Sequence, residues 1–384
     1  MKIEYDYIIA GAGCAGLSLL MRMMKDDYFK NKHILIVDSD KKNSNDRTWC
    51  FWEKEPDIFE HIIHHRWEQL HFYSSQYCNE LQIQPYTYKM IQGIDLYECV
   101  KSESSTHKNI HWLTDTILHI INDQATNQAG IVLSNQTIYA TKIFNSILFD
   151  PIQTTNHQYY FQQHFKGWVI KSNKPCFNQN IATFMDFRVS QEHGTTFMYV
   201  LPTSSTTALV EYTLFTEELL PQDAYDTALK HYIDQFLHID SYTVEHQEYG
   251  IIPMTNANFN VVNGNIIHIG IAGGQAKAST GYAFKFIQKR TAEIITSLKS
   301  NRQFMPANSF NVKKGMLYDS TLLNVLHHKK MGGADIFASI FKSTKASKVL
   351  SFLDNNSSLL TDLQIMSSVP TKIFLPAALK EWFL

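Results

Sequence analysis

A glycine-rich turn near the start of the chain leaves few folds open to it. Residues 5–10 (YDYIIA) form a short apolar run that is typical of a buried parallel strand. The turn 11–16 (GAGCAG) follows, then a segment with helical apolar spacing, and then a second apolar run at 33–38 that ends in Asp38. A strand, a glycine turn, a helix and a second strand in this order predict one βαβ unit.

Each glycine of this turn has a role in binding a dinucleotide. Gly11 permits the tight turn, Gly13 lets a pyrophosphate approach the backbone, and Gly16 allows the helix to pack closely on the strand. The helix N-terminus presents free N–H groups and the positive end of its dipole. Asp38 is expected to accept hydrogen bonds from a ribose diol. We therefore predict dinucleotide binding, with a glycine turn used only for packing as the alternative.

The middle of the chain has the pattern of an antiparallel sheet. Turn-rich segments at 190–194 and 203–207 separate apolar runs of strand length. These runs lie at 163–170, 180–189, 195–202 and 207–215. We predict that the last three form a meander and that an amphipathic helix follows at about 222–237.

The βα pattern then returns, which predicts a discontinuous nucleotide-binding domain. Residues 265–274 have the pattern of a strand that ends in glycines, residues 283–298 that of a helix, and 305–384 are expected to be mostly helical. We predict a FAD-binding βαβ part, a mixed part that completes the nucleotide domain, an antiparallel β substrate domain, a returning FAD-binding part and a helical C-terminal region. Their expected ranges are 1–75, 76–155, 156–255, 256–300 and 301–384.

FAD is favoured over NAD as the dinucleotide because a second glycine segment, 270–284, recurs late in the chain. In two-domain flavoproteins such a junction lies beside the ribityl chain and the flavin ring. Gly273, Gly274 and Gly281 are the candidate cofactor contacts there, and the following helix end is expected to stabilise negative charge on the flavin. The predicted fold class is α/β, with a Rossmann-like FAD-binding domain of the flavin hydroxylase or glutathione reductase type, an inserted antiparallel sheet and a helical C-terminal region.

Composition excludes several other classes of function. The net charge is −2, from 34 basic and 36 acidic side chains, so nucleic acid is not an expected partner. The five cysteines form no C-x-x-C pair, which argues against a disulfide framework and a structural zinc site. No apolar run reaches the length that spans a bilayer, and the chain starts directly with a strand. A cytoplasmic protein without a metal is expected.

Several segments together resemble the bacterial lycopene β-cyclases across most of the chain. Their order and spacing are more specific than any one of them. The matching segments are GAGCAGLSL (11–19), DRTWCFW (46–52), GIDLY (93–97), QHFKGW (163–168), FMDFR (184–188), FMYVLP (197–202), VEYT (210–213), EYGIIPM (248–254) and STGYAF (279–284). Tyr212 departs from the pattern, because many members carry a second acid at that position.

The resemblance implies a reaction without net redox change, in which the acyclic end groups of lycopene close to β-ionone rings. Its acid–base glutamate corresponds to Glu211, which shares a strand face with Leu209 and Thr213. Asp186 is a second catalytic candidate, although an ion pair with Arg188 is an equally good interpretation. Reduced FAD is expected to stabilise the carbocation, with NAD(P)H needed only to reduce the flavin.

Other residues have weaker assignments. Arg47 is a candidate contact to flavin phosphate or ribose. Clustered aromatic residues are candidates for a polyene tunnel, with core packing as the commoner role: Trp49, Phe51 and Trp52. The histidine clusters lack the companion ligands of a metal site and are expected on solvated helix faces. They comprise His61, His64, His65, His327 and His328.

Lycopene is insoluble in water, so the resemblance also implies contact with a membrane surface. The segments 322–341 and 373–384 mix apolar residues with lysines, as interfacial helices do. A location peripheral to the inner membrane is therefore expected. Two alternative functions remain at this point: a flavin-dependent monooxygenase or isoprenoid reductase on the same fold, and a carotenoid-binding flavoprotein without catalysis. The absence of any Asp-Gly pair argues against a hydroxylase.

Overall fold

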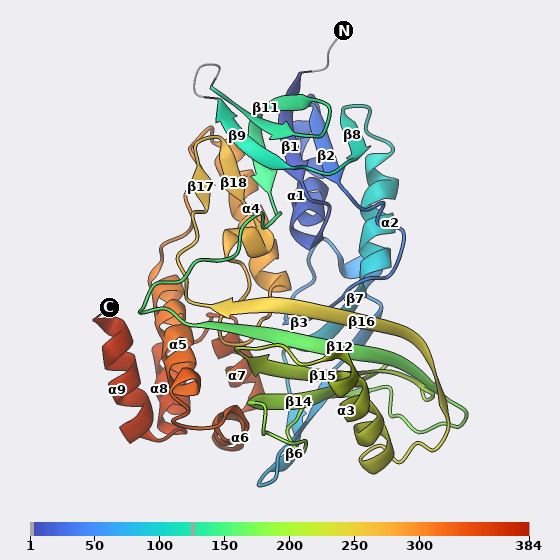
Figure 1. Ribbon diagram of the computed structural model, residues 1–384, viewed down its shortest axis with the longest axis vertical. Helices are drawn as coiled ribbons and strands as arrows, with labels where there is room; N and C mark the ends of the chain where they lie inside the picture. The colour runs from blue at the N-terminus through green and yellow to red at the C-terminus, as the bar shows by residue number, and fades with distance from the viewer. Residues whose placement is uncertain (1–3, 124–126, 384) are drawn as a thin grey trace.

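The computed structural model describes residues 4–123 and 127–383. Figure 1 shows two sheets stacked along the long axis of the molecule, with the C-terminal helices beside the lower one. We call the upper one the N-terminal sheet and the lower one the central sheet. A small antiparallel ribbon connects them, and the candidate site lies where the three meet.

The N-terminal sheet contains the predicted βαβ unit. Its parallel strands follow the order β18-β11-β1-β2-β8, and further antiparallel strands extend it beside β11 and β18. The parallel strands are β1 (Tyr5–Ala10), β2 (Ile34–Asp38), β8 (Ile110–Thr114), β11 (Thr137–Asn145) and β18 (Ile266–His268). The antiparallel ones are β9 (His119–Asp123), β10 (Gln128–Val132) and β17 (Val262–Asn263).

Apolar side chains cover both faces of this sheet, which is why its strands are continuous apolar runs. Ile9 and Ile36 pack against the helices α1 (Cys14–Met24), α2 (Gly93–Ser104) and α4 (Phe284–Lys299). Ile8 and Leu35 pack on the opposite face, against residues of β10. The helix α1 is positioned by this packing directly after the glycine turn.

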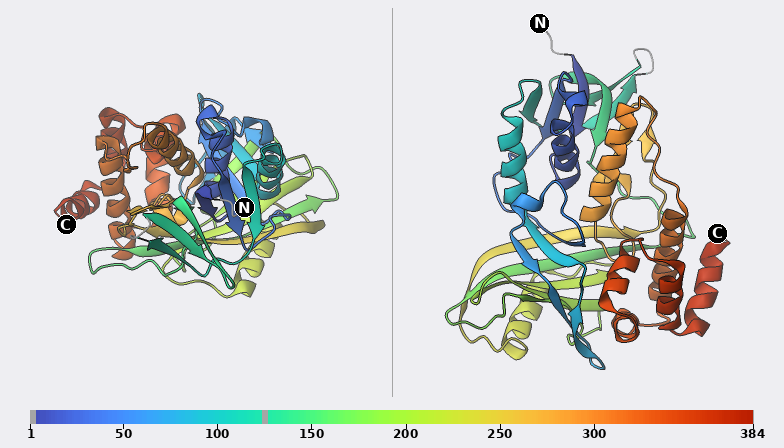
Figure 2. Two further views of the ribbon diagram at one scale, coloured as in Figure 1. Left: turned by 90° about the horizontal axis from the view of Figure 1, so that it is seen from above. Right: turned by 180° about the vertical axis from the view of Figure 1, so that it is seen from behind.

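The central sheet has the strand order β16-β12-β15-β14-β13-β5-β6. Its strands are β5 (Gln69–Tyr73), β6 (Cys78–Gln82), β12 (Tyr160–Ser172), β13 (Ile181–Asp186), β14 (Thr195–Pro202), β15 (Thr207–Thr216) and β16 (Tyr242–Thr255). The helix α3 (Gln222–Gln235) packs on one face of it through Leu229, Tyr232 and Ile233. The opposite face is turned towards the N-terminal sheet and the C-terminal helices (Figure 2).

The strands β13, β14 and β15 form the predicted meander, and β12 pairs with β15 and β16 in the same sheet. Two features of the fold differ from the predictions. The strands β5 and β6 precede the range expected for the substrate domain and still belong to the central sheet. The strand expected at 265–274 ends at His268, because Gly270 adopts a left-handed conformation (φ 62°) and starts a short 3-10 turn, η3 (Gly270–Gly273). The predicted domain ranges stay a prediction.

The connecting ribbon has the strand order β3-β7-β4 and runs between the two sheets (Figure 2). Its strands are β3 (Thr48–Glu53), β4 (His65–Trp67) and β7 (Thr87–Gln92), and a short 3-10 turn, η2 (Glu60–Ile62), precedes β4. A second such turn, η1 (Asp27–Phe29), follows α1. The ribbon matters for function because β3 and the loop before it line the candidate site.

The C-terminal region is helical, as predicted. It comprises α5 (Phe310–His327), α6 (Gly333–Ser343), α7 (Ala346–Leu353), α8 (Leu359–Ser367) and α9 (Thr371–Trp382). The helices α6 and α7 pack apolar residues such as Phe337, Phe341 and Leu350 against the central sheet. Within the residues that the structure describes, none of the helices has both the length and the apolar character needed to cross a bilayer.

Candidate active site

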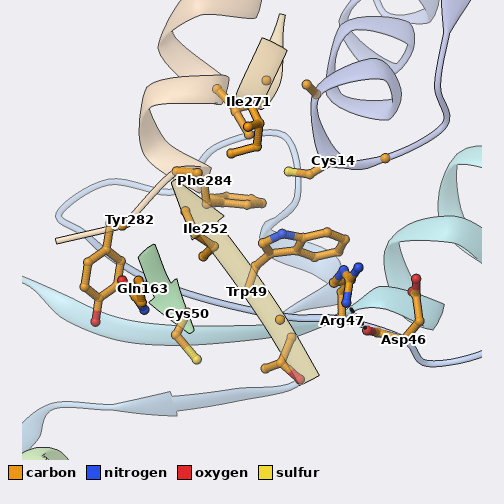
Figure 3. Close-up of a pocket in the computed structure, with 18 of the residues that line it drawn as sticks. Cys14, Asp46, Arg47, Trp49, Cys50, Gln163, Ile252, Ile271, Tyr282 and Phe284 are labelled. Atoms are coloured by element: carbon orange, nitrogen blue, oxygen red, sulfur yellow. Dashed lines mark hydrogen bonds between the residues drawn. The ribbon is translucent and has the colours of Figure 1, made fainter. Parts of the chain in front are cut away.

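A cavity of about 470 Å³ lies between the N-terminal sheet, the connecting ribbon and the central sheet. This volume is within the usual range for a small-molecule site. Figure 3 shows Arg47 and Asp46 at one end of the cavity and Tyr282, Gln163 and Cys50 at the other. The cavity therefore joins the glycine turn to the face of the central sheet that carries Glu211.

The glycine turn forms one end of this cavity. Gly11 (φ 98°) and Gly13 line it, and a Cβ built on Gly13 would meet no described atom within 4 Å. A Cβ on Gly16 would lie 2.1 Å from the carbonyl oxygen of Gly11, so this glycine serves the packing of α1. The two glycines that face the cavity leave room for a ligand to approach the start of the helix.

Two charged residues stand beside the glycine turn. Asp38 lines the cavity and accepts hydrogen bonds from the backbone N–H groups of Ala12 (2.7 Å) and Asp40 (2.8 Å). Arg47 also lines the cavity and donates a hydrogen bond to the carbonyl oxygen of Tyr249 at 3.1 Å. The structure thus brings the predicted acid and arginine to the same end of the cavity.

The late glycine segment contributes only part of what the sequence indicated. Gly281 lines the cavity, together with its neighbour Thr280. Gly273 and Gly274 are not part of the lining, because a Cβ on Gly273 would lie 2.3 Å from the carbonyl oxygen of His268 and Gly274 packs under Phe259. Gly273 and Gly274 thus shape the turn η3 and its end, and the contact of the three glycines with a cofactor stays a prediction.

Glu211 lies in a row of residues that crosses the central sheet. On its β14 side it is paired with Tyr199, and on its β12 side with Gly167, which is paired in turn with Glu248 of β16. Residues opposite each other on adjacent strands project to the same face. Because Gly167 has no side chain, the two carboxyl groups meet across it.

Burial raises the pKa of Glu211, and the neighbouring carboxyl group of Glu248 raises it further. The Oγ1 of Thr213 donates a hydrogen bond to the Oε1 of Glu211 at 2.7 Å and opposes this rise. The pKa of Glu248 is also raised by burial. The predicted acid therefore lines the cavity in an environment that keeps one carboxyl group protonated.

Sequence analysis did not identify Glu248 as a site residue. The segment 248–254 carried a signal, since Glu248 is its acidic member. Only the pairing register of β12 with β16 shows that this side chain lies behind Glu211. Tyr212, which stands where many related sequences have a second acid, projects to the opposite face and packs with Tyr225 of α3.

Aromatic side chains form the end of the cavity next to Glu211. The hydroxyl group of Tyr282 lies 3.1 Å from that of Tyr88 and 3.2 Å from that of Tyr199. All three side chains line the cavity, and burial raises their pKa well above the usual value, so the hydroxyl groups are neutral. Phe184 flanks Tyr199 at a ring distance of 6.1 Å. This end of the cavity is thus largely apolar.

The three aromatic residues predicted as tunnel candidates have different roles. Trp49 lines the cavity (Figure 3). Phe51 stacks on Phe284 at a ring distance of 4.1 Å, and Trp52 packs behind Tyr282 at 4.6 Å. Trp49 is therefore the one of the three in contact with the cavity, and the other two support its wall.

Asp186 lies on the opposite face of the central sheet. Its carboxylate accepts hydrogen bonds from Arg188 (2.9 Å to Nε) and from the hydroxyl group of Tyr232 in α3 (2.7 Å), and it is fully buried. It does not line the cavity. The catalytic prediction for Asp186 is thereby corrected: the residue takes the structural ion pair that was its alternative.

The histidine clusters do not lie on one helix face. His61 belongs to η2, His65 to β4, and His327 ends α5, where it contacts Glu217 at 2.6 Å. Within residues 4–123 and 127–383, no group of His, Cys, Asp and Glu side chains is arranged to hold a metal ion.

Unpaired polar atoms test whether the cavity fits a flavin. The Oε1 of Gln163 and the Oγ1 of Thr280 are buried and have no hydrogen-bond partner among the described residues. Both side chains line the cavity, and a Cβ on Gly281 would lie 1.9 Å from that Gln163 oxygen. A ligand with a diphosphate at the glycine turn and a polar heteroaromatic ring at the far end would satisfy these atoms. The residues present fit a flavin dinucleotide.

Comparison with known proteins gives a family and a fold. The model of the family described as lycopene cyclase protein matches residues 6–378. No curated protein matches the chain.

Solved structures of flavoproteins share the fold. A geranylgeranyl bacteriochlorophyll reductase-like protein from Thermoplasma acidophilum is 12% identical, with 99% of this chain and 98% of that chain covered and a TM-score of 0.61. A flavoprotein/dehydrogenase from Cytophaga hutchinsonii is 12% identical, with 95% and 100% covered and a TM-score of 0.60. A flavin-dependent halogenase from Xanthomonas campestris is 10% identical, with 100% and 97% covered and a TM-score of 0.60. At these identities the likeness concerns the fold alone, and it confirms the predicted fold class.

Proposed function

Because the chain belongs to the lycopene cyclase family, we propose that it is a lycopene β-cyclase. It converts the acyclic ψ-end groups of lycopene into β-ionone rings, through γ-carotene to β-carotene, and is therefore an isomerase without net redox change. The observation that carries this proposal is the Glu211 carboxyl group, which lines the cavity at its aromatic end and has a raised pKa.

Ring closure needs an acid that stays neutral until the substrate is bound. A proton adds to the terminal double bond and leaves a tertiary cation, the next double bond attacks this cation, and the new ring loses a proton. An alkene is a very poor base, so a carboxyl group that has already lost its proton cannot serve as the proton donor. Glu211 is suited to this step, since burial and the Glu248 carboxyl group favour its protonated form.

The aromatic end of the cavity protects the cation from water. Tyr88, Tyr199 and Tyr282 direct their hydroxyl groups at one another, which leaves ring faces for the hydrocarbon. Water admitted here would add to the cation and give an alcohol instead of a ring. The proposed role of these side chains is exclusion of water and orientation of the end group.

FAD is the proposed cofactor. Gly11, Gly13 and Asp38 would hold its diphosphate and ribose, with Arg47 beside them, and the far end of the cavity would hold the ring next to Thr280 and Gln163. When bound in its reduced form, the flavin supplies negative charge that stabilises the developing cation. NAD(P)H is proposed as the reductant that prepares this form.

Two glycines of the turn give a matched test of flavin binding. The Gly13→Ala substitution places a methyl group in open space and should lower flavin affinity about tenfold or more without unfolding the protein. The Gly16→Ala substitution places its methyl group 2.1 Å from a carbonyl oxygen and should destabilise the protein itself. Flavin titration and thermal unfolding separate the two effects, and an unchanged flavin affinity in Gly13→Ala contradicts the assigned site.

Contact with the membrane is part of the proposal, because lycopene has to be taken from a bilayer. Of the two predicted segments, 322–341 is largely packed into the core, through residues such as Leu323 and Phe337. The helices α8 and α9 carry a group of exposed apolar side chains, with Leu360 80% and Trp382 69% exposed. The others of this surface are Leu359, Leu363, Met366, Leu375, Leu379 and Phe383. We assign the contact to these two helices, at the cytoplasmic face of the inner membrane.

The activity is tested by expressing the protein in lycopene-accumulating cells and identifying the pigments. The expected result is cyclised carotenoid with the native chain and unchanged lycopene with Glu211→Gln. Substrate-dependent NAD(P)H consumption that matches the product formed would instead indicate a monooxygenase or reductase. Carotenoid binding that is unaffected by Glu211→Gln, without ring closure, would indicate a binding protein.

A further inference from the structure

The second carboxyl group of the site, that of Glu248, has no role in the reaction described so far. Its side chain is 7% exposed and lies behind Glu211, outside the lining of the cavity. Within the described parts of the chain, neither Glu248 nor Glu211 forms an ion pair with a lysine, arginine or histidine. Two carboxyl groups that meet without a counter-ion need another explanation.

The geometry of the central sheet brings the two groups together. Gly167 of β12 is paired with Glu211 on one side and with Glu248 on the other. A Cβ on Gly167 would lie 3.2 Å from the Cγ of Glu248 and 2.8 Å from the Cδ1 of Leu209. The space that a side chain would fill at this position is therefore taken by Leu209 and Glu248. The carboxyl groups of Glu248 and Glu211 are hydrogen-bonded to each other.

Two carboxyl groups in hydrogen-bond contact cannot both be ionised in a buried site unless a positive charge, such as the substrate cation, lies beside them. One of them keeps a proton, and the other accepts the hydrogen bond from it. We propose that Glu248 is a positioning residue for Glu211: the pair holds one proton across Gly167, and this shared proton is the one that Glu211 delivers to the terminal double bond. The inference rests on the proposed cyclase function and adds a residue to it.

The surroundings favour the negative charge on Glu248 and the proton on Glu211. The Thr48 side chain donates a hydrogen bond to Glu248, and the positive charge of Arg47 also opposes the rise that burial causes in its pKa. Glu211 has no such cation beside it and receives a hydrogen bond from Thr213 alone. The remaining titratable groups that face the pair are Asp46, Cys50 and Tyr199.

The pair also accounts for both proton transfers of the reaction. In the first step the O–H bond of the pair breaks and a C–H bond forms at the chain end. In the last step a ring C–H bond breaks, its electron pair becomes the ring double bond, and the proton returns to a carboxylate of the pair. The pair thus begins and ends each ring closure with one proton, without an external acid or base.

The pH dependence of ring closure tests the pairing. In Glu248→Gln the neighbouring negative charge is lost, so the pKa of Glu211 should fall and the alkaline limit of activity should move about one pH unit lower. The matched control is Glu245→Gln, on the exposed part of the same strand β16, for which the limit should not move. If Glu248→Gln instead lowers activity by the same factor at every pH and leaves the alkaline limit unchanged, Glu248 has a purely structural role and the proposal is overturned.

Infrared spectroscopy gives a readout that does not depend on turnover. The native protein should show a C=O band of protonated carboxyl groups that disappears in alkaline buffer, and the component of this band that belongs to Glu211 should be absent in Glu211→Gln. In Glu248→Gln, and in Gly167→Ala, whose methyl group would lie 3.2 Å from the Cγ of Glu248 and displace that side chain, the band should titrate at lower pH. A band unaffected by both substitutions refutes the shared proton even if ring closure is found. A shifted band without ring closure refutes the proposed function and leaves the pair intact.

Discussion

Glu211 and Asp186 are two carboxyl groups on the same sheet with opposite surroundings. Asp186 faces α3, where Arg188 and the hydroxyl group of Tyr232 satisfy its charge. Glu211 faces the cavity, where its partners are a threonine hydroxyl group and another carboxyl group. A buried carboxyl group beside a cation is held in its ionised form and takes part in a structural ion pair. A buried carboxyl group without a neighbouring cation retains its proton and can donate it to a substrate.

The largest difference between the two positions should appear in activity. We expect Glu211→Gln to lower the rate of ring closure by about 10³-fold, because the amide has no acidic proton to give. The free energy of unfolding at neutral pH should not fall, because the amide removes the proton that native Glu211 has to release on unfolding. Initial rates with lycopene-containing vesicles and urea unfolding check both statements. A rate within tenfold of the native one would remove Glu211 from the mechanism.

The converse substitution should affect stability and spare the chemistry. Asp186→Asn leaves Arg188 without its counter-ion and should lower the free energy of unfolding by about 3 kcal/mol, towards the low end for a buried pair because Arg188 is partly exposed. Urea unfolding measures this loss. The rate per folded, flavin-loaded molecule should stay close to the native value. A large fall in that rate with unchanged stability would return Asp186 to the catalytic residues.

The pH dependence of stability should separate the two carboxyl groups as well. The pKa of Glu211 is raised in the folded state, chiefly by burial. Over the range between its ordinary and its raised pKa, only the folded state holds this proton, so stability falls as the pH rises. Each unit of pKa difference costs about 1.4 kcal/mol at the alkaline end of that range.

Glu211→Gln should therefore gain stability over the native protein as the pH rises above the ordinary pKa of a glutamate, with the largest difference in alkaline buffer and little difference below that ordinary pKa. The deficit of Asp186→Asn should stay constant over the same range, because Asp186 raises the pKa of the Arg188 guanidinium and the charge of the arginine persists. Thermal unfolding of the three proteins across this pH range tests the contrast. Parallel curves for native protein and Glu211→Gln would show that the carboxyl group is not buried as described.

The smallest effect is expected from Thr213→Val. The hydroxyl group of Thr213 donates a hydrogen bond to Glu211 and lowers its pKa, so its removal should raise the alkaline limit of activity by up to about one pH unit. Thr207→Val, at the start of the same strand β15, is the control. A limit that moves downwards in Thr213→Val would show that the hydroxyl group favours the protonated form instead.

The fold was largely predictable because its signals are local. The turn 11–16 with its flanking strands specifies a βαβ unit, and the turn-rich segments 190–194 and 203–207 between apolar runs specify a meander. The place of β12 beside β15 was not predictable, because the residue pattern of a strand does not show which distant strand it pairs with. The length of β18 was overestimated. Apolar residues continue beyond His268, but the left-handed Gly270 ends the strand.

The same limit applies to the candidate site. Glu211 was identified because the segment 210–213 resembles the acidic strand of the family, and Gly11, Gly13 and Asp38 follow from the glycine motif. The orientation of Asp186 depends on a register shift in β13, which changes the alternation between Thr183 and Asp186 and leaves the carboxyl group on the α3 side. The position of Glu248 beside Glu211 could not be predicted, because it depends both on the register of β12 with β15 and on the register of β12 with β16.

The strands β5 and β6 have a consequence for how the molecule is divided. They come from the N-terminal half of the chain, and β5 pairs in parallel with β13, which would otherwise be the last strand of the central sheet. A fragment limited to the later strands would expose the backbone of β13 and the rings that Phe72 covers, among them Phe187. Such a fragment would associate with its own copies through that open edge rather than fold as an independent module. The central sheet therefore needs strands from both halves of the chain.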